Sequence, residues 1–333
     1  MRIVDAHNDL LIETVFRKAE PNPFAAHYLG KLEQGGVGLQ VCPLSVDMEL
    51  YPSQVFEKGI EQVAAWHRIL RENDHRVVAV RSVNDLDAVE DGSRIGLLLA
   101  MEGVEPFGYS VGLADVFWEL GVRMMALCWN RRNVFADGAG EGRGGGLSVL
   151  GKELVDRLAQ LGVILDLAHA SDQTFSDVVE RAPNASIVVS HACCRAVLDT
   201  PRNVSDSQLR MLADRGGVLG VMAIPLAVDP QAPSLDRLVD HIDHAVAVMG
   251  IEHVGIGGDF MRQLVDSGAE QAHPANAFLA PGASMGDAIS GLAGPDEYPS
   301  LVDALRTRGY EGADLDAILG GNFLRLLRTS LPR

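Results

Sequence analysis

Eight short runs rich in Val, Ile and Leu recur along the chain, and segments with helical periodicity lie between them. Runs that are apolar at almost every position are typical of parallel strands buried on both faces. The predicted strands are Ile3–Ala6, Val37–Pro43, Arg94–Met101, Val122–Cys128, Val163–Ala168, Ser186–Ser190, Gly217–Met222 and Val254–Gly258, with a small extra strand at Val77–Arg81. The predicted amphipathic helices include Gln54–Glu72, Leu150–Leu161, Asp206–Arg215 and Leu235–Met249.

This alternation predicts an α/β protein with a (β/α)8 TIM-type barrel. The 333 residues suit one barrel domain with insertions, so we expect a single domain over residues 1–333. A doubly wound open sheet is the main alternative. No GxGxxG motif follows the first strand, which argues against dinucleotide binding.

Two long glycine-rich loops follow predicted strands four and eight, at Trp129–Gly146 and Met261–Asp296. Loops after barrel strands lie at the C-terminal mouth, where they can shape a pocket. The alternative is that they are plain flexible connections.

Charge and apolar content exclude some classes of partner. The chain has 28 basic and 45 acidic residues, a net charge of −17, which disfavours nucleic-acid binding.

The longest mostly apolar stretch, Gly216–Val228, is too short to span a membrane, and no signal peptide is visible at the N-terminus. The four cysteines (Cys42, Cys128, Cys193, Cys194) form no CxxC pattern. We therefore expect a reduced cytoplasmic protein with no membrane partner.

Residues that can bind a metal fall at the ends of five predicted strands. Carboxyl ends of barrel strands converge on one face, so these side chains are expected to meet there. An N/O ligand set of this kind suits zinc. The residues are His7, Asp9, Glu102, His169, His191 and Asp259.

Two divalent ions about 3.5 Å apart need an anionic group that reaches both. Many barrel metallohydrolases use a carboxylated lysine, but none of Lys18, Lys31, Lys58 and Lys152 ends a predicted strand. The bridge is therefore assigned to Glu102 by elimination. His169 and His191 would complete the second ion.

Several short motifs occur in a characteristic order and spacing. They are DAHNDL at Asp5–Leu10, MEG at Met101–Gly103, DLAH at Asp166–His169, SH at Ser190–His191, PRN at Pro201–Asn203 and GGDF at Gly257–Phe260. In these segments the chain resembles the membrane dipeptidase (renal dipeptidase) family of the amidohydrolase superfamily, from Asp5 to about Leu327.

The resemblance implies an amidohydrolase-like barrel with two zinc ions per chain, although other divalent ions also suit such ligands. His7 and Asp9 would bind one ion, His169 and His191 the other, and Glu102 would bridge them. The resemblance also implies that Arg202 binds the substrate carboxylate and that Asp259 shuttles a proton. The alternatives are an ion pair of Arg202 with Asp199 or Asp206, and a helix N-cap or outer acceptor role for Asp259.

Two positions depart from the family pattern. Trp129 replaces a histidine at the end of the fourth strand, and Met261-Arg262 replace the usual Asp-Gly after the GGDF motif. Trp129 and Asn130 are predicted to contact the substrate, although Asn130 is equally suited to forming a turn. Arg262 is a candidate for a second positive contact.

Two further groups are excluded from the predicted site. His241 and His244 have a spacing close to that of metal ligands, but flanking Asp240 and Asp243 indicate a solvated helix face. Cys193 and Cys194 lack an evident activating base, and we expect them to pack under the barrel mouth.

The predicted function is a zinc-dependent dipeptidase that hydrolyses small dipeptides, L-Xaa-D-Xaa among them, through a metal-bridging hydroxide. One alternative is hydrolysis of an N-acyl amino acid or a lactam at the same binuclear site. A metal-loaded but inactive binding protein is the other, and retention of Asp259 argues against it. A dipeptide-like small molecule is the expected partner, and a homodimer is plausible for the family.

Overall fold

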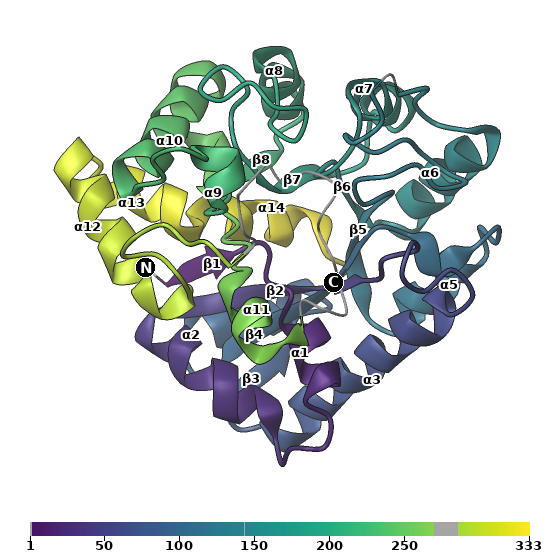
Figure 1. Cartoon of the computed structure of the whole chain (residues 1–333), viewed down its shortest axis with the longest axis horizontal. Coiled ribbons are helices and arrows are strands. Elements are labelled where there is room, and N and C mark those ends of the chain that lie inside the picture. The colour runs from purple at the N-terminus through teal and green to yellow at the C-terminus, as the bar shows by residue number, and fades with distance from the viewer. Residues whose placement is uncertain (1, 143, 270–285) are drawn as a thin grey trace.

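The computed structural model describes residues 2–142, 144–269 and 286–333. These residues form a nine-stranded sheet in which every strand pairing is parallel (Figure 1). The strands are β1 (Ile3–Asp5), β2 (Val37–Ser45), β3 (Val77–Ala79), β4 (Ile95–Glu102), β5 (Val122–Ala126), β6 (Ile164–Asp166), β7 (Ile187–Ala192), β8 (Val218–Val221) and β9 (Val254–Ile256).

The sheet closes into an eight-stranded barrel. The strand order is β2-β1-β9-β8-β7-β6-β5-β4-β3, and an additional pairing of β2 with β4 completes the ring. β3 pairs only with β4 and lies outside the ring. The predicted barrel, its eight strands and the small extra strand are therefore confirmed.

Helices surround the barrel, as Figure 1 shows, and most of them follow a strand in the sequence. The α-helices are α1 (Leu10–Phe16), α2 (Gly30–Gln34), α3 (Val55–Glu72), α4 (Asp87–Glu90), α5 (Leu113–Glu119), α6 (Val149–Leu161), α7 (Asp172–Arg181), α8 (Asp206–Asp214), α9 (Pro225–Val228), α10 (Leu235–Met249), α11 (Arg262–Ser267), α12 (Tyr298–Arg308), α13 (Gly312–Asp316) and α14 (Asn322–Ser330). Short 3-10 turns are η2 (Val83–Leu86), η3 (Glu105–Phe107), η4 (Ile251–His253) and η7 (Pro295–Glu297), and η1 (Ala25–Leu29) and η8 (Ala317–Gly321) are π-helical.

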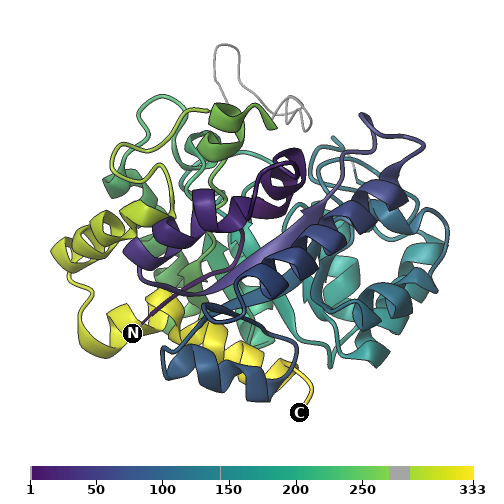
Figure 2. The same ribbon diagram turned by 90° about the horizontal axis from the view of Figure 1, so that it is seen from below.

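Alternate residues of the strands pack into two different cores. One core fills the barrel and includes Val4, Leu39 and Leu98, while the other lies between the strands and the helices and includes Ile3, Leu97 and Leu99. Residues of α14, including Phe323, Leu326 and Leu327, join the interior core. In Figure 2, α14 and both termini lie at the lower edge and α11 at the upper edge. The carboxyl ends of the strands lie at the opposite end of the barrel from α14, where a functional site can form.

The two long loops differ from each other in structure. The described part of the Trp129–Gly146 loop has no helix, and isolated backbone pairings of Ala136 with Leu147 and of Gly138 with Ala170 anchor it. The expectation of a loop throughout Met261–Asp296 is wrong at its start, where α11 forms. Residues 270–285 of that segment lie outside the described residues.

All four cysteines are buried as free thiols. Among the residues that the structure describes, no helix combines the length and the apolar character needed to cross a membrane.

The inner wall of the barrel requires glycine where β8 approaches β7. A Cβ on Gly220 would lie 2.0 Å from the Ser190 carbonyl oxygen, whereas a Cβ on Gly30 of α2 would meet nothing within 4 Å. We therefore predict that Gly220→Ala lowers the free energy of unfolding by about 1–3 kcal/mol, the usual result of overpacking. Gly30→Ala should leave it unchanged or raise it by about 0.5–1 kcal/mol. Urea unfolding monitored by circular dichroism would measure both, and equal stability of the two variants would contradict the packing described here.

Candidate metal centre

The six predicted metal-site residues lie together at the carboxyl ends of the barrel strands. His7 and Asp9 follow β1, Glu102 ends β4 and His169 follows β6. His191 belongs to β7, and Asp259 follows β9. All six are buried, with at most 6% of any residue exposed. Barrel closure is what brings together residues that are up to 252 positions apart in the chain (259 − 7).

Glu102 is at the centre of the cluster. Its Oε1 atom lies 2.8 Å from His169 Nε2, 3.2 Å from His191 Nε2 and 3.6 Å from His7 Nε2. One carboxylate oxygen therefore faces three imidazole nitrogens, as expected of a group placed between two sets of ligands.

His7 links this group to the other carboxylates. Its Nε2 atom lies 3.7 Å from Asp9 Oδ1 and 3.7 Å from Asp259 Oδ1. Two overlapping sets of side chains bring their ligand atoms within 4.8 Å of one another. The sets are His7, Glu102 and His191, and His7, Asp9 and Asp259.

The donor atoms fit divalent cations. His7 Nε2 and Asp9 Oδ1 are buried and have no hydrogen-bond partner among the described residues. His169 Nδ1 lies 2.6 Å from Asn130 Oδ1, an oxygen that can only accept, so Nδ1 carries the proton and Nε2 presents a lone pair. That Nε2 lies 2.8 Å from His191 Nε2. Imidazole nitrogens and carboxylate oxygens that converge in this way match the ligand preferences of zinc.

Burial also makes the cluster electrostatically costly without a cation. Burial, reinforced by Asp9, raises the pKa of Glu102 well above its usual value. Burial likewise raises the pKa of Asp259 to about 6, although His7 opposes this shift. Burial lowers the pKa of His191 well below its usual value. For His7 burial opposes protonation, but Glu102 and the other carboxylates outweigh it and raise the pKa to about 10. A bound cation would stabilise the ionised carboxylates that burial disfavours, and it would favour the neutral form of His7, which the neighbouring carboxylates otherwise keep protonated.

Arg202 borders the cluster on the β7 side. Its Nη2 atom donates to the His191 carbonyl oxygen at 2.9 Å and lies 3.1 Å from His169 Nε2. In the described part of the chain Arg202 forms no ion pair, so the alternative pairing with Asp199 or Asp206 is not observed. A guanidinium that lines a cavity without a carboxylate partner can bind one from a ligand.

Trp129 and Asn130 also border this cavity. Trp129 packs beside the His169 ring, with centroids 6.1 Å apart, and its backbone N–H donates to Glu105. Asn130 accepts from His169, so its observed contact orients a predicted ligand. The predicted contacts of Trp129 and Asn130 with substrate remain predictions.

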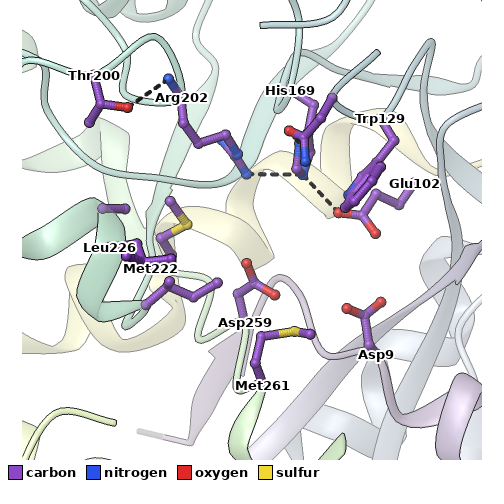
Figure 3. A pocket seen from close by; sticks show the side chains of 13 residues that line it. Asp9, Glu102, Trp129, His169, Thr200, Arg202, Met222, Leu226, Asp259 and Met261 are labelled. Carbon is purple, nitrogen blue, oxygen red and sulfur yellow. Dashed lines mark hydrogen bonds and ion pairs between the residues drawn. The ribbon is translucent and has the colours of Figure 1, made fainter. Parts of the chain in front are cut away.

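A single cavity joins the cluster to an apolar wall that the sequence analysis missed. In Figure 3 the side chains of Met222, Leu226 and Met261 lie across the cavity from Trp129 and Glu102. Ile224 and Ala227 extend this wall. The full lining is Asp9, Glu102, Trp129, Asn130, His169, Thr200, Arg202, Met222, Ile224, Leu226, Ala227, Asp259 and Met261. The only sequence signal was the apolar segment Gly216–Val228, which contains β8 and α9 and also fits ordinary core packing.

The neighbouring candidates lie outside this arrangement. Arg262 is exposed, lies 3.5 Å from Asp266 and does not line this cavity, and its role as a second positive contact remains a prediction. Cys193 and Cys194 are buried, and burial raises the pKa of both thiols, as expected of packing residues.

The expectation of a solvated face at His241 is wrong. His241 is fully buried, accepts from the Cys194 backbone N–H at Nδ1 and donates to the Val228 carbonyl oxygen from Nε2. Asp240 and Asp243 are partly exposed and pair with Arg308 on the other side of the helix. Both ring nitrogens of His241 are used in packing, which agrees with its exclusion from the metal site.

The fold is shared with solved peptidase structures. The chain superposes on the dipeptidase AC, a metallopeptidase, with a TM-score of 0.86 and 21% identity, over 100% of this chain and 99% of that one. It superposes on a Rhodobacter sphaeroides metallopeptidase liganded with a phosphinate mimic of L-Ala-D-Ala with a TM-score of 0.85 and 20% identity, over 99% of each chain.

Sequence comparisons place the chain in a family. It is 30% identical to dipeptidase aclJ of Aspergillus oryzae over 312 residues, which cover 89% of this chain and 68% of that relative. It is 26% identical to human dipeptidase 3 over 98% of this chain but only 64% of the relative's length. Residues 1–281 match the family model described as membrane dipeptidase, peptidase family M19. The chain therefore belongs to the membrane dipeptidase family.

Proposed function

We propose that this protein is a dipeptidase that uses two divalent cations, zinc being the ion that the ligands suit best. The observation that carries the proposal is the convergence of three imidazoles and two aspartates around Glu102, with the guanidinium of Arg202 at the same cavity. Membership of a peptidase family supports the reaction type.

In this proposal His7 and Asp9 hold one cation, His169 and His191 hold the other, and Glu102 lies between them. The central position of Glu102 Oε1 supports its bridging role. When bound, the cations would lower the pKa of a shared water and polarise the scissile carbonyl.

The chain's own residues orient the substrate and move the proton. The Arg202 guanidinium matches the C-terminal carboxylate of a dipeptide in two hydrogen bonds and so limits the substrate to a short one. Asp259 lies at the cavity, near His7, where its carboxylate can take a proton from the attacking water and return it to the leaving amine.

The apolar wall suggests which side chains fit. Met222, Ile224, Leu226 and Met261 face the cavity from β8, α9 and the start of α11, beside Arg202. A substrate held at its carboxylate by Arg202 would place its C-terminal side chain against this wall. Burial of a Leu-sized side chain there contributes roughly 1.5–3 kcal/mol.

A dipeptide panel tests the proposal directly. Zinc-reconstituted protein should hydrolyse Ala-Leu and Ala-Met with a kcat/KM roughly 10- to 100-fold above that for Ala-Asp, because only the former bury an apolar group. A chelator should abolish turnover, and the C-terminal amides should be poor substrates because they lack the charge that Arg202 binds. The L-Ala-D-Xaa series belongs in the panel because a relative of the same fold binds a mimic of L-Ala-D-Ala.

Absence of dipeptide cleavage by protein with bound metal would overturn the dipeptidase proposal and favour N-acyl or cyclic amides as substrates. Equal rates for Ala-Leu and Ala-Asp would contradict only the role of the apolar wall.

Asp259→Asn tests the proton transfer. The amide cannot accept the proton, so we predict a loss of kcat of about 100-fold or more with metal content unchanged. Asp266→Asn is the matched control, since Asp266 is an exposed aspartate of α11 that lies 3.5 Å from Arg262 and does not line this cavity. Steady-state kinetics would measure kcat and elemental analysis the metal content of both variants. A wild-type kcat in Asp259→Asn would refute the role assigned to Asp259.

A further inference from the structure

Two buried aspartates beneath the metal centre repeat the same arrangement. Asp5 is the last residue of β1 and Asp166 is the last residue of β6, and neither is among the candidate ligands. Both are buried, with 0% and 6% of the residue exposed. Each precedes a candidate ligand closely in the sequence, His7 and His169 respectively.

Each aspartate uses one oxygen to join two segments of backbone. Asp5 Oδ1 accepts from the His7 N–H at 3.2 Å and from the Gly258 N–H at 2.8 Å. Because β1 and β9 are neighbours, this oxygen connects the segments that follow two adjacent strands.

Asp166 Oδ1 makes the same pair of bonds on the other side of the barrel. It accepts from the Ala168 N–H at 3.0 Å and from the Ser190 N–H at 2.9 Å. Here the adjacent strands are β6 and β7. In both cases the first donor is the residue two positions further along the chain.

The backbone N–H groups that donate to Asp5 and Asp166 belong to candidate ligands or to the residues directly before them. His7 is itself held, while Gly258 precedes Asp259, Ala168 precedes His169 and Ser190 precedes His191. The two aspartates thus fix the backbone of four of the six residues of the metal centre.

Backbone conformation at the site shows why such support is needed. Among the described residues, three that are not glycine have a positive φ, and two of them are His169 (64°) and Asp259 (53°). The left-handed region is unfavourable for residues with a Cβ, and it persists where the surroundings enforce it. Each of these residues directly follows an amide that Asp166 or Asp5 holds.

We propose that Asp5 and Asp166 are positioning residues that hold His169 and Asp259 in the left-handed conformation, so that the ligand atoms converge before a cation binds. The proposal rests on the metal-dependent function proposed above. It assigns these aspartates no contact with metal or substrate, because they act through backbone amides alone.

Asp166 provides the cleaner test, because Asp166→Asn keeps an oxygen that can accept both bonds whereas Asp166→Ala removes it. Asp166→Ala should weaken zinc affinity by tenfold or more in chelator competition, the usual cost of losing support around a metal ligand. It should also alter the d–d absorption spectrum of the Co²⁺-substituted protein. Asp166→Asn should restore affinity to within about threefold of wild type.

Asn322→Ala is the matched control for stability alone. Asn322 is buried and its Nδ2 group donates to two backbone carbonyls, Ile251 and Val254, at 2.7 Å each, at the far end of the barrel. Loss of these two hydrogen bonds in Asn322→Ala should lower the midpoint of thermal unfolding and leave zinc affinity unchanged. Wild-type zinc affinity in Asp166→Ala, or the same loss of affinity in Asn322→Ala, would overturn the proposal while leaving the proposed dipeptidase function intact.

A crystal structure of the metal-free wild-type protein gives a second test that does not depend on the folding of a variant. The proposal predicts that φ at His169 and Asp259 stays positive without metal. Relaxation of either residue to negative φ would overturn it. Failure of the wild-type protein to bind any divalent cation would instead overturn the proposed function, and the positioning role with it.

Discussion

β2 pairs with β4 along its length, from Leu39 beside Gly96 to Ser45 beside Glu102, and this parallel pairing closes the barrel. Closure fixes where every other strand ends, because each strand is hydrogen-bonded to two neighbours in the ring. Glu102 is the last residue of its strand, so the register that closes the ring also brings its carboxylate to the mouth. The histidines and aspartates that surround it come from strands β1, β6, β7 and β9 or from the residues that follow them.

Burial of so many ionisable groups in one place has an energetic consequence. Burial disfavours the ionised carboxylates that bind metal, as the raised pKa values of Glu102 and Asp259 indicate, and the neighbouring carboxylates favour the protonated form of His7. A bound cation would offset that cost, and ligands that are already oriented would reduce the reorganisation that opposes binding. Asp5 and Asn130 bond to the ligands His7 and His169, and Asp166 bonds to the residues that precede His169 and His191, and these bonds provide the orientation.

Much of this could be predicted from the sequence because parallel barrels have a simple pattern. Strands buried on both faces are apolar throughout, so a histidine or carboxylate directly after such a run is conspicuous, as in Asp166–His169. The six residues that cluster at the barrel mouth were predicted in this way. The contact of Asn130 with His169 and the apolar wall of the cavity were not predicted. Both depend on the paths of loops, which no periodicity in the sequence encodes. His241 was wrongly predicted to lie on a solvated face because its neighbours Asp240 and Asp243 are charged, although these are partly exposed and the helix buries His241 between them.

The central claim is that this cluster holds two divalent cations, and metal analysis of protein crystals tests it most directly. Crystals grown with Zn²⁺ should show two anomalous-scattering peaks per chain, one beside His7 and Asp9 and one beside His169 and His191, with Glu102 between them. Elemental analysis of the same protein should give close to two zinc ions per chain. Peaks at other positions, or a cluster that stays without metal at saturating zinc, would contradict the account.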